Sequence, residues 1–197
     1  MTPNSNVYVD LMQGDAIIEP PVYQTVRLKD SYAFNPVPEG VDARLIKGGQ
    51  ANLWSEQLFT YRHLQYMLYP RAWAVAEDLW SNPGNKNWDS FTSRVESHFE
   101  RSDLAERKYA RSMYDPIFAF EKGTNGRIIV DMKPEVKDLN LHYSFDHSYP
   151  DQFYPVATGK IEVPKDAVEM KVISYRAGKP IGRMISFPIA EMKKRIK

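Results

Sequence analysis

The chain has 197 residues, of which 43% are hydrophobic, and its 26 basic and 25 acidic residues leave a formal net charge of +1. This balance of charge gives no indication of the basic surface by which proteins bind nucleic acid. Because the sequence contains no cysteine, it excludes disulfide bonds and thiol chemistry.

Neither a targeting signal nor a membrane span is recognisable in the sequence. Residues 1–5, Met-Thr-Pro-Asn-Ser, lack the basic start and the apolar core of a signal peptide. No apolar run approaches the roughly 18 to 20 residues of a transmembrane helix. An apolar run that begins almost at once, with no preceding helix or cap, is typical of an excised fragment.

Two short segments each carry an aromatic residue and a carboxylate two positions apart. The apolar run Val7–Val9 contains Tyr8 and is followed by Asp10, and the run Ile46–Trp54 is followed by Glu56. Both are predicted to be strands, in which side chains at i and i+2 point to the same face. A ring offers a flat surface to the C–H face of a pyranose, and a carboxylate accepts hydrogen bonds from hydroxyl groups. The two pairs therefore indicate a sugar pocket.

The segment between these two runs, Gln13–Val41, is rich in proline, glycine and aromatic residues and has no sustained period. It predicts a long ordered loop with a helical turn near Thr25–Tyr32. Apolar side chains at helical spacing from Leu64 to Leu79 predict a helix that is kinked or broken at Pro70.

A further helix is predicted to begin after a turn at Asn82–Asn87. The Asn87 side chain is suited to cap the helix, and Asp89 stands favourably in its first turn. Its apolar stripe predicts a helix that continues, with an interruption near Ser102, to about Met113.

After Asp115 the apolar pattern changes to period two, which predicts strands. Strands are predicted at Arg127–Met132, Leu139–Phe145, Gly159–Val163, Val168–Tyr175 and Met184–Phe187. Closely spaced short strands predict a small antiparallel sandwich. The basic residues at 193–197 are predicted to form a solvated tail.

Three ordered motifs resemble the C-terminal part of glycoside hydrolase family 20, the β-N-acetylhexosaminidases. They are Tyr-x-Asp-x-x-Gln-Gly-Asp at 8–15, Gly-Gly-Gln-Ala-Asn-Leu-Trp-Ser-Glu at 48–56, and Pro-Arg-Ala-x-Ala-x-Ala-Glu-x-x-Trp-Ser at 70–81. The segment Tyr143–Asp151 is similar to a turn of the C-terminal β-domain appended to many such enzymes, although His147 and Asp151 depart from it.

The resemblance implies a fold that is α/β plus all-β. Residues 1–114 would supply the last two strand-helix units of a (β/α)8 TIM barrel, and residues 115–197 a C-terminal β-sandwich domain of hexosaminidase type. Because a complete barrel needs eight strands and about 250 residues, two strands alone would leave open edges. We therefore expect a homodimer through these edges, or poor stability.

The resemblance also implies a substrate-assisted, retaining hydrolysis of terminal β-linked N-acetylhexosamine. In that mechanism the substrate's 2-acetamido group is the nucleophile, which makes the family an exception among glycosidases. An adjacent Asp-Glu pair orients the acetamido group and acts as general acid/base. Residues 1–197 contain no Asp-Glu dipeptide, so we expect the pair to lie outside this chain and the chain alone to be inactive.

Four residues are candidates for the sugar pocket through this resemblance. Tyr8 would donate its hydroxyl to the acetamido carbonyl, and Trp54 would line the floor of the subsite. Asp10 and Glu56 would accept hydrogen bonds from the O4 and O6 hydroxyls. All four contacts would position the substrate, since intramolecular attack requires an aligned acetamido group.

Several further expectations complete the interpretation. Arg71 and Glu77 are interpreted as structural ion-pairing residues, and the aromatic side chains of the second half as packing residues, with glycan binding as the alternative. The histidines show no ligand spacing, so neither a metal nor another cofactor is expected. The resemblance implies glycan partners carrying N-acetylhexosamine and a bacterial protein of the periplasm or cell exterior. The alternative function is a separately encoded, non-catalytic carbohydrate-binding or interaction module.

Overall fold

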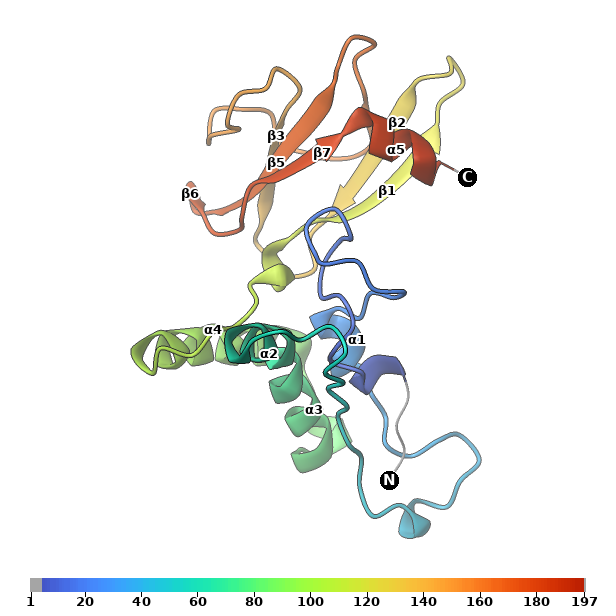
Figure 1. Cartoon of the computed structure of the whole chain (residues 1–197), viewed down its shortest axis with the longest axis vertical. Helices are drawn as coiled ribbons and strands as arrows, with labels where there is room; N and C mark the ends of the chain where they lie inside the picture. Colours follow the sequence, from blue (N-terminus) through green and yellow to red (C-terminus); the bar gives the residue numbers. More distant parts are fainter. Residues whose placement is uncertain (1–4, 197) are drawn as a thin grey trace. The chain divides into compact units, whose positions relative to one another are not determined.

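The computed structural model describes residues 5–196, and the chain divides after Met113 into two compact units, called unit 1 and unit 2 here (Figure 1). The fold is mixed α/β, with the larger helices in unit 1 and both sheets in unit 2. The division falls beside Asp115, where the sequence changes from helical to alternating spacing.

Unit 1 consists of helices joined by long irregular segments. Its elements are η1 (Ser5–Val7), α1 (Leu28–Tyr32), η2 (Ala43–Leu45), α2 (Tyr61–Leu68), α3 (Arg71–Trp80), η3 (Pro83–Asn85) and α4 (Trp88–Leu104), and the short η4 (Ser112–Tyr114) follows. The predicted break at Pro70 is confirmed, because α2 ends before this residue and α3 begins after it. Proline lacks the N–H that would continue the helical hydrogen bonds.

Helix α4 begins as the sequence predicts but ends earlier. The Asn87 side chain accepts a hydrogen bond of 2.9 Å from the Ser90 N–H, which confirms the predicted cap. The continuation to Met113 is wrong. Glu106 adopts a left-handed φ of 51°, and the Arg107 N–H bonds back to the Ser102 carbonyl at 2.8 Å. This backbone arrangement satisfies the last carbonyls of a helix and ends it.

The two predicted strands of unit 1 are wrong as elements, although their segments do pair. Tyr8 and Asn52 form an isolated parallel bridge. The Val9 N–H donates to Asn52 O, and the Asn52 N–H donates to Val7 O, both at 2.8 Å. Within residues 5–196 this pairing extends over one bridge, whereas a strand depends on pairs repeated along its length.

A small apolar cluster lies beneath this bridge. Val7, Phe34 and Val75 are buried together, and Leu79 of α3 packs against them. A β-carbon added at Gly49 would lie 2.7 Å from Cε1 of Phe34, which is closer than real side chains approach. The glycine therefore lets the segment before Asn52 pass directly over the Phe34 ring.

Unit 2 contains two antiparallel sheets. The first has the order β1-β2-β4 and consists of β1 (Ile117–Lys122), β2 (Ile128–Lys133) and β4 (Ile161–Glu162). In the second, β3 (Asn140–Ser144), β5 (Glu169–Arg176) and β6 (Lys179–Pro180) lie in that order, and β7 (Ile185–Pro188) also pairs with β5 (Figure 1). The sheets touch through aromatic rings. The ring centroids of Phe118 and Phe120 on β1 lie 5.1 and 4.9 Å from the ring centroid of Phe187 on β7.

Two features of unit 2 differ from the sequence prediction. Strand β1 was not expected, and the supposed solvated tail contains helix α5 (Ile189–Arg195). Met192 is fully buried in this helix, and the Arg195 guanidinium lies 4.8 Å from the ring of Phe187. Helix α5 is held by the buried side chains of Ile189 and Met192, while Lys193 and Lys194 are exposed as the sequence predicts. Residue 197 of the predicted tail lies outside the described residues.

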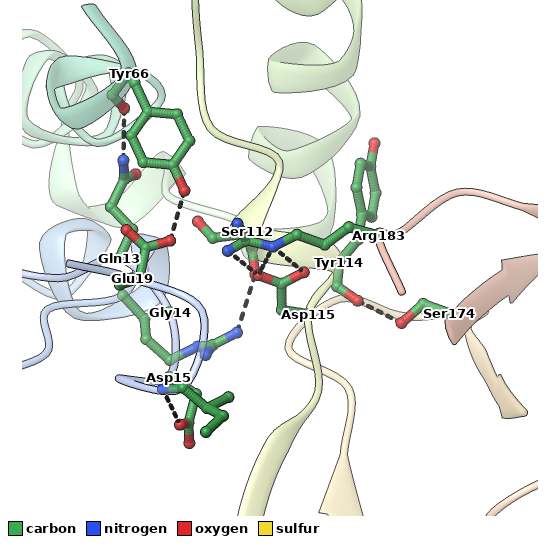
Figure 2. A network of polar contacts seen from close by, with 12 residues as sticks. Gln13, Gly14, Asp15, Glu19, Tyr66, Ser112, Tyr114, Asp115, Ser174 and Arg183 are labelled. Atoms are coloured by element: carbon green, nitrogen blue, oxygen red, sulfur yellow. Dashed lines mark hydrogen bonds and ion pairs between the residues drawn. The ribbon is translucent and has the colours of Figure 1, made fainter. Parts of the chain in front are cut away.

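Polar contacts fix the start of unit 2 to its second sheet (Figure 2). The Ser174 hydroxyl on β5 donates to the Tyr114 carbonyl. The carboxylate of Asp115, whose side chain is buried, accepts from Arg183 Nη2 at 2.8 Å.

Among the helices of residues 5–196, none is both long and apolar enough to cross a membrane.

Candidate functional site

Tyr8 and Asp10 are the more accessible residues of their segment. Val7, Val9 and Leu11 are at most 1% exposed, whereas Tyr8 and Asp10 are both half-buried. The apolar residues thus anchor the segment in the core. Residues 9–10 form a turn, so the strand alternation predicted to put Tyr8 and Asp10 on one face does not apply.

The parallel bridge aligns this segment with the one that carries Trp54. Tyr8 pairs with Asn52, so Asp10 and Trp54 each follow the paired position by two residues, in the two segments that the bridge joins. Trp54 is 53% exposed, which leaves much of its indole accessible. Gln50 steadies the bridge, because its Nε2 donates to Asn52 Oδ1 at 2.8 Å.

Glu56 does not share a strand face with Trp54, so that part of the prediction is wrong. Residues 55–57 bend and turn, and the Leu58 N–H donates to the Ser55 carbonyl at 3.1 Å. Glu56 is exposed on this turn. Its role in a sugar pocket stays a prediction, as do the roles of Tyr8, Asp10 and Trp54.

Arg71 anchors the segment of Tyr8 and Asp10 by a hydrogen bond to its backbone. Its side chain is fully buried, and its guanidinium donates to Val9 O at 2.7 Å, to Val26 O at 2.9 Å and to Met67 O at 2.9 Å. Val9 lies between Tyr8 and Asp10, so this one side chain ties both to the start of α3. A planar guanidinium can donate in several directions at once, which a lysine ammonium on a flexible stem does less well.

The charge of Arg71 is balanced by nearby acidic groups rather than by a direct ion pair with Glu77. Burial lowers the pKa of Arg71 to about 9, and the negative charges of Glu19 and Asp10 act in the opposite direction. Glu77 instead forms an ion pair with Arg94, with its Oε1 at 2.6 Å from Nη2. The two predicted structural residues therefore serve different contacts.

A second set of contacts fixes the loop that follows Asp10 to helix α2 (Figure 2). Gln13 donates from Nε2 to the Tyr66 carbonyl, and the Tyr66 hydroxyl donates to Glu19 Oε1, both at 2.5 Å. Gln13 is only 1% exposed. These contacts position the motif that begins at Tyr8 against the helices of unit 1.

Asp10 retains an unused acceptor. Its Oδ1 is buried and has no hydrogen-bond partner within residues 5–196. A buried carboxylate oxygen without a donor costs free energy, so such an atom is a candidate partner for a ligand hydroxyl.

Asp78 anchors α3 and is not part of this site. Its side chain is fully buried and pairs with Lys86 Nζ, which also donates to the Tyr32 carbonyl at 2.7 Å. Burial raises the pKa of Asp78 to about 7, because desolvation outweighs the attraction of Lys86. Glu77 and Asp78 are therefore a helix-anchoring pair.

Sequence reasoning missed the central position of Arg71. The residue follows Pro70 at the start of a helix, where a charged side chain is usually solvated, and its three acceptors lie 4, 45 and 62 residues away along the chain. Such contacts leave no periodic signal. Across residues 5–196, His, Cys, Asp and Glu side chains form no group of three or more arranged to hold a metal ion.

Comparison with known proteins connects this geometry to a family. The sequence profile of the glycosyl hydrolase family 20 catalytic domain matches residues 1–83. A β-hexosaminidase of Porphyromonas gingivalis is 38% identical over 109 residues, which are 53% of this chain and 14% of that protein. A β-N-acetylhexosaminidase of Cellulomonas fimi is 37% identical over 103 residues, which are 50% of this chain and 20% of that protein.

Solved structures agree with these matches. An exo-β-N-acetylglucosaminidase of Vibrio harveyi in complex with N-acetylglucosamine is 30% identical, with a TM-score of 0.50, over 55% of this chain and 18% of that one. A Streptomyces plicatus β-hexosaminidase mutant in complex with its product, N-acetylglucosamine, is 27% identical, with a TM-score of 0.52, over 56% of this chain and 23% of that one.

The chain spans a fifth or less of the length of the two sequence relatives. The residues matched by the profile include Tyr8 and Asp10, Asn52 of the parallel bridge, and the buried Arg71. Through residues 1–83, this chain is similar to the catalytic domain of glycosyl hydrolase family 20.

Proposed function

We propose that unit 1 is the sugar-positioning part of a β-N-acetylhexosaminidase, which hydrolyses terminal β-linked N-acetylhexosamine. Its general acid/base would come from a part of the enzyme other than residues 1–197, in which no Asp-Glu dipeptide occurs. The match of residues 1–83 to the family 20 catalytic domain supports the reaction class.

The observation that carries this proposal is the parallel bridge between Tyr8 and Asn52. It places two segments side by side, one with a phenol and a carboxylate and the other with an exposed indole. In the proposed pocket the Tyr8 hydroxyl donates to the acetamido carbonyl, which holds the nucleophile beneath the anomeric carbon. Trp54 covers an apolar face of the sugar, and Asp10 accepts from a sugar hydroxyl.

Arg71 acts as a positioning residue in this proposal, because its side chain is fully buried and holds Val9 by its carbonyl. Positioning matters in a substrate-assisted reaction, since the nucleophile belongs to the substrate and must be aligned. Glu56 completes the proposed pocket as an acceptor for the O4 or O6 hydroxyl from its exposed turn.

The proposal also covers architecture and setting. Unit 1 would be the last part of a (β/α)8 barrel, and unit 2 the sandwich domain that follows it. The substrate class is glycans that end in N-acetylhexosamine, and the proposed location is the periplasm or the cell exterior. Association of two chains through the open edges of unit 1 would give a dimer in sedimentation, and a cooperatively folding monomer would contradict it.

The test is to measure both binding and turnover by the purified chain. We expect no hydrolysis of a chromogenic N-acetyl-β-glucosaminide and weak binding of N-acetylglucosamine in an NMR titration. Tyr8→Phe should weaken binding about two- to twelvefold, because it removes one hydrogen bond of about 0.5–1.5 kcal/mol. Tyr23→Phe is the matched control, since Tyr23 is 83% exposed and lies outside the site.

Two results would contradict the proposal in different ways. Turnover that falls in Tyr8→Phe would show that a proton donor lies within residues 1–197. Binding that is unchanged in both Tyr8→Phe and Trp54→Ala would show that the paired segments do not form the sugar site.

A further inference from the structure

Unit 2 contains a hollow of about 470 Å³ that the proposed function does not use. It lies where β3 ends, between the loop at 145–155 and the turn that precedes β5. Its volume falls in the range of about 300–1,000 Å³ that is typical of small-ligand sites. The hollow is therefore large enough for a sugar residue.

The wall of the hollow combines aromatic rings with carboxylates. Tyr143, Phe145 and Tyr154 contribute rings, and Asp146 and Asp166 contribute acidic groups. Tyr143 and Phe145 are half-buried, while Leu141 on the same strand is only 2% exposed. The two rings thus keep accessible surface at the hollow, and the choice between packing and glycan binding for these residues stays a prediction.

Hydrogen bonds hold this wall in shape before any ligand arrives. The Tyr143 N–H donates to the Pro155 carbonyl at 3.1 Å, and the Tyr154 hydroxyl donates to Asp146 Oδ2 at 3.0 Å. The Ser148 N–H donates to Asp146 Oδ1, also at 3.0 Å. A wall that is already ordered loses less conformational entropy on binding.

The rings of this wall are held at a fixed angle as well. The centroids of Tyr143 and Phe145 lie 5.6 Å apart, with their planes at 72°. Two faces in different orientations can contact two sides of a bulky ligand, whereas stacked parallel rings would present one.

We propose that this hollow binds a neutral hexose unit of a glycan. The C–H face of a pyranose lies against the ring of Phe145 or Tyr143, and its hydroxyls donate to Asp146 and Asp166. Each carboxylate oxygen has two lone pairs, so Asp146 can accept a further hydrogen bond beyond those from Ser148 and Tyr154. Two carboxylates in one wall disfavour anionic sugars, because like charges would be brought together.

This site is independent of the one in unit 1, since its lining residues all belong to unit 2. It would attach the chain to glycan without taking part in hydrolysis. The two proposals can therefore fail separately, and substitutions in one unit distinguish them.

The test is an NMR titration of the full chain with methyl β-glucopyranoside and with a β-1,4-linked tetramer of N-acetylglucosamine. Phe145→Ala and Asp166→Asn should each weaken binding at this site about tenfold, which corresponds to about 1.4 kcal/mol. Phe153→Ala is the matched control, because Phe153 is 86% exposed on the same loop and does not line the hollow. Trp54→Ala, in unit 1, should leave binding at the hollow unchanged.

Asp166→Asn decides the outcome if Phe145→Ala fails to fold, since Asp166 is exposed and its amide replacement has the same size. The proposal is overturned if neither sugar binds, or if binding is unchanged in both variants. It is also overturned if Trp54→Ala alone abolishes binding, a result that would favour the unit 1 site. Binding of an apolar dye without binding of either sugar would show a general apolar hollow and count against the proposal.

Discussion

Replacing Arg71 by lysine tests how the candidate site is supported. The arginine donates to three buried carbonyls, those of Val9, Val26 and Met67. A lysine ammonium can keep about one of these contacts, so two charged hydrogen bonds are lost. At about 1.5–3 kcal/mol for each, the free energy of unfolding should fall by about 3 to 6 kcal/mol. That is a large part of the about 5–15 kcal/mol that stabilises a domain.

The assay is urea unfolding followed by tryptophan fluorescence. The four tryptophans of the chain, at positions 54, 73, 80 and 88, all lie before residue 113, so the signal reports on unit 1 alone. Circular dichroism at the wavelengths of strands would follow unit 2 in the same samples. Because Arg71 belongs to unit 1, the unfolding of unit 2 should be unchanged.

Arg94→Lys is the matched control for this experiment. Arg94 also forms two short hydrogen bonds, at 2.6 and 2.8 Å to Glu77, but its side chain is 51% exposed. Exposed ion pairs contribute about 0–1 kcal/mol, so this variant should lose no more than that. If Arg71→Lys is no less stable than Arg94→Lys, the three buried contacts do not support the site and the reasoning is refuted.

Two further predictions concern the packing and charge of unit 1. Burial raises the pKa of Asp78 to about 7 in the folded chain, above the 3.8 of a solvated aspartate, so its contribution to stability is complete below about pH 4 and is lost as the pH rises through 7. This loss amounts to about 4 kcal/mol at 1.36 kcal/mol per pH unit. Urea titrations from pH 4 to 8 should show it in the wild type and not in Asp78→Asn. If the free energy of unfolding depends on pH in the same way in both proteins, the assignment is contradicted. Gly49→Ala should destabilise unit 1 by about 1–3 kcal/mol, because the new β-carbon lies 2.7 Å from Cε1 of Phe34. Gly84→Ala is the control, because a β-carbon there would lie 3.7 Å from its nearest neighbour, and it should change the free energy of unfolding in urea only a little. Equal effects of the two substitutions would argue against the close contact at Gly49.

Local signals in the sequence were sufficient for much of the secondary structure. The break at Pro70 and the cap at Asn87 follow from the chemistry of single residues, since proline lacks an N–H and an asparagine side chain accepts one. Strand β5 follows from Val172, Ile173 and Tyr175, residue types that favour strands. Helix α5 was missed because its basic residues concealed a short apolar side that includes Met192.

The candidate site was only partly accessible to the same reasoning. The motifs at Tyr8 and Trp54 identified residue types suited to a sugar, and the family match of residues 1–83 agrees with their origin. Their expected strands did not form, because a strand needs repeated partners and the described residues of these two segments share one parallel bridge, between Tyr8 and Asn52. Alternation of side chains therefore could not place Glu56, which lies on a turn.

By itself, the sequence indicated a resemblance to one family in its first part, the residue types of the candidate pocket, the break at Pro70 and the start of α4 at its Asn87 cap. The tertiary structure alone decided which distant groups meet. It placed the Arg71 guanidinium against carbonyls up to 62 residues away along the chain. It also paired the segment of Tyr8 and Asp10 with the segment of Trp54. It also opened the hollow beside Tyr143. Helix caps and breaks arise from neighbours along the chain, whereas burial and cavities depend on contacts between segments that no local pattern encodes.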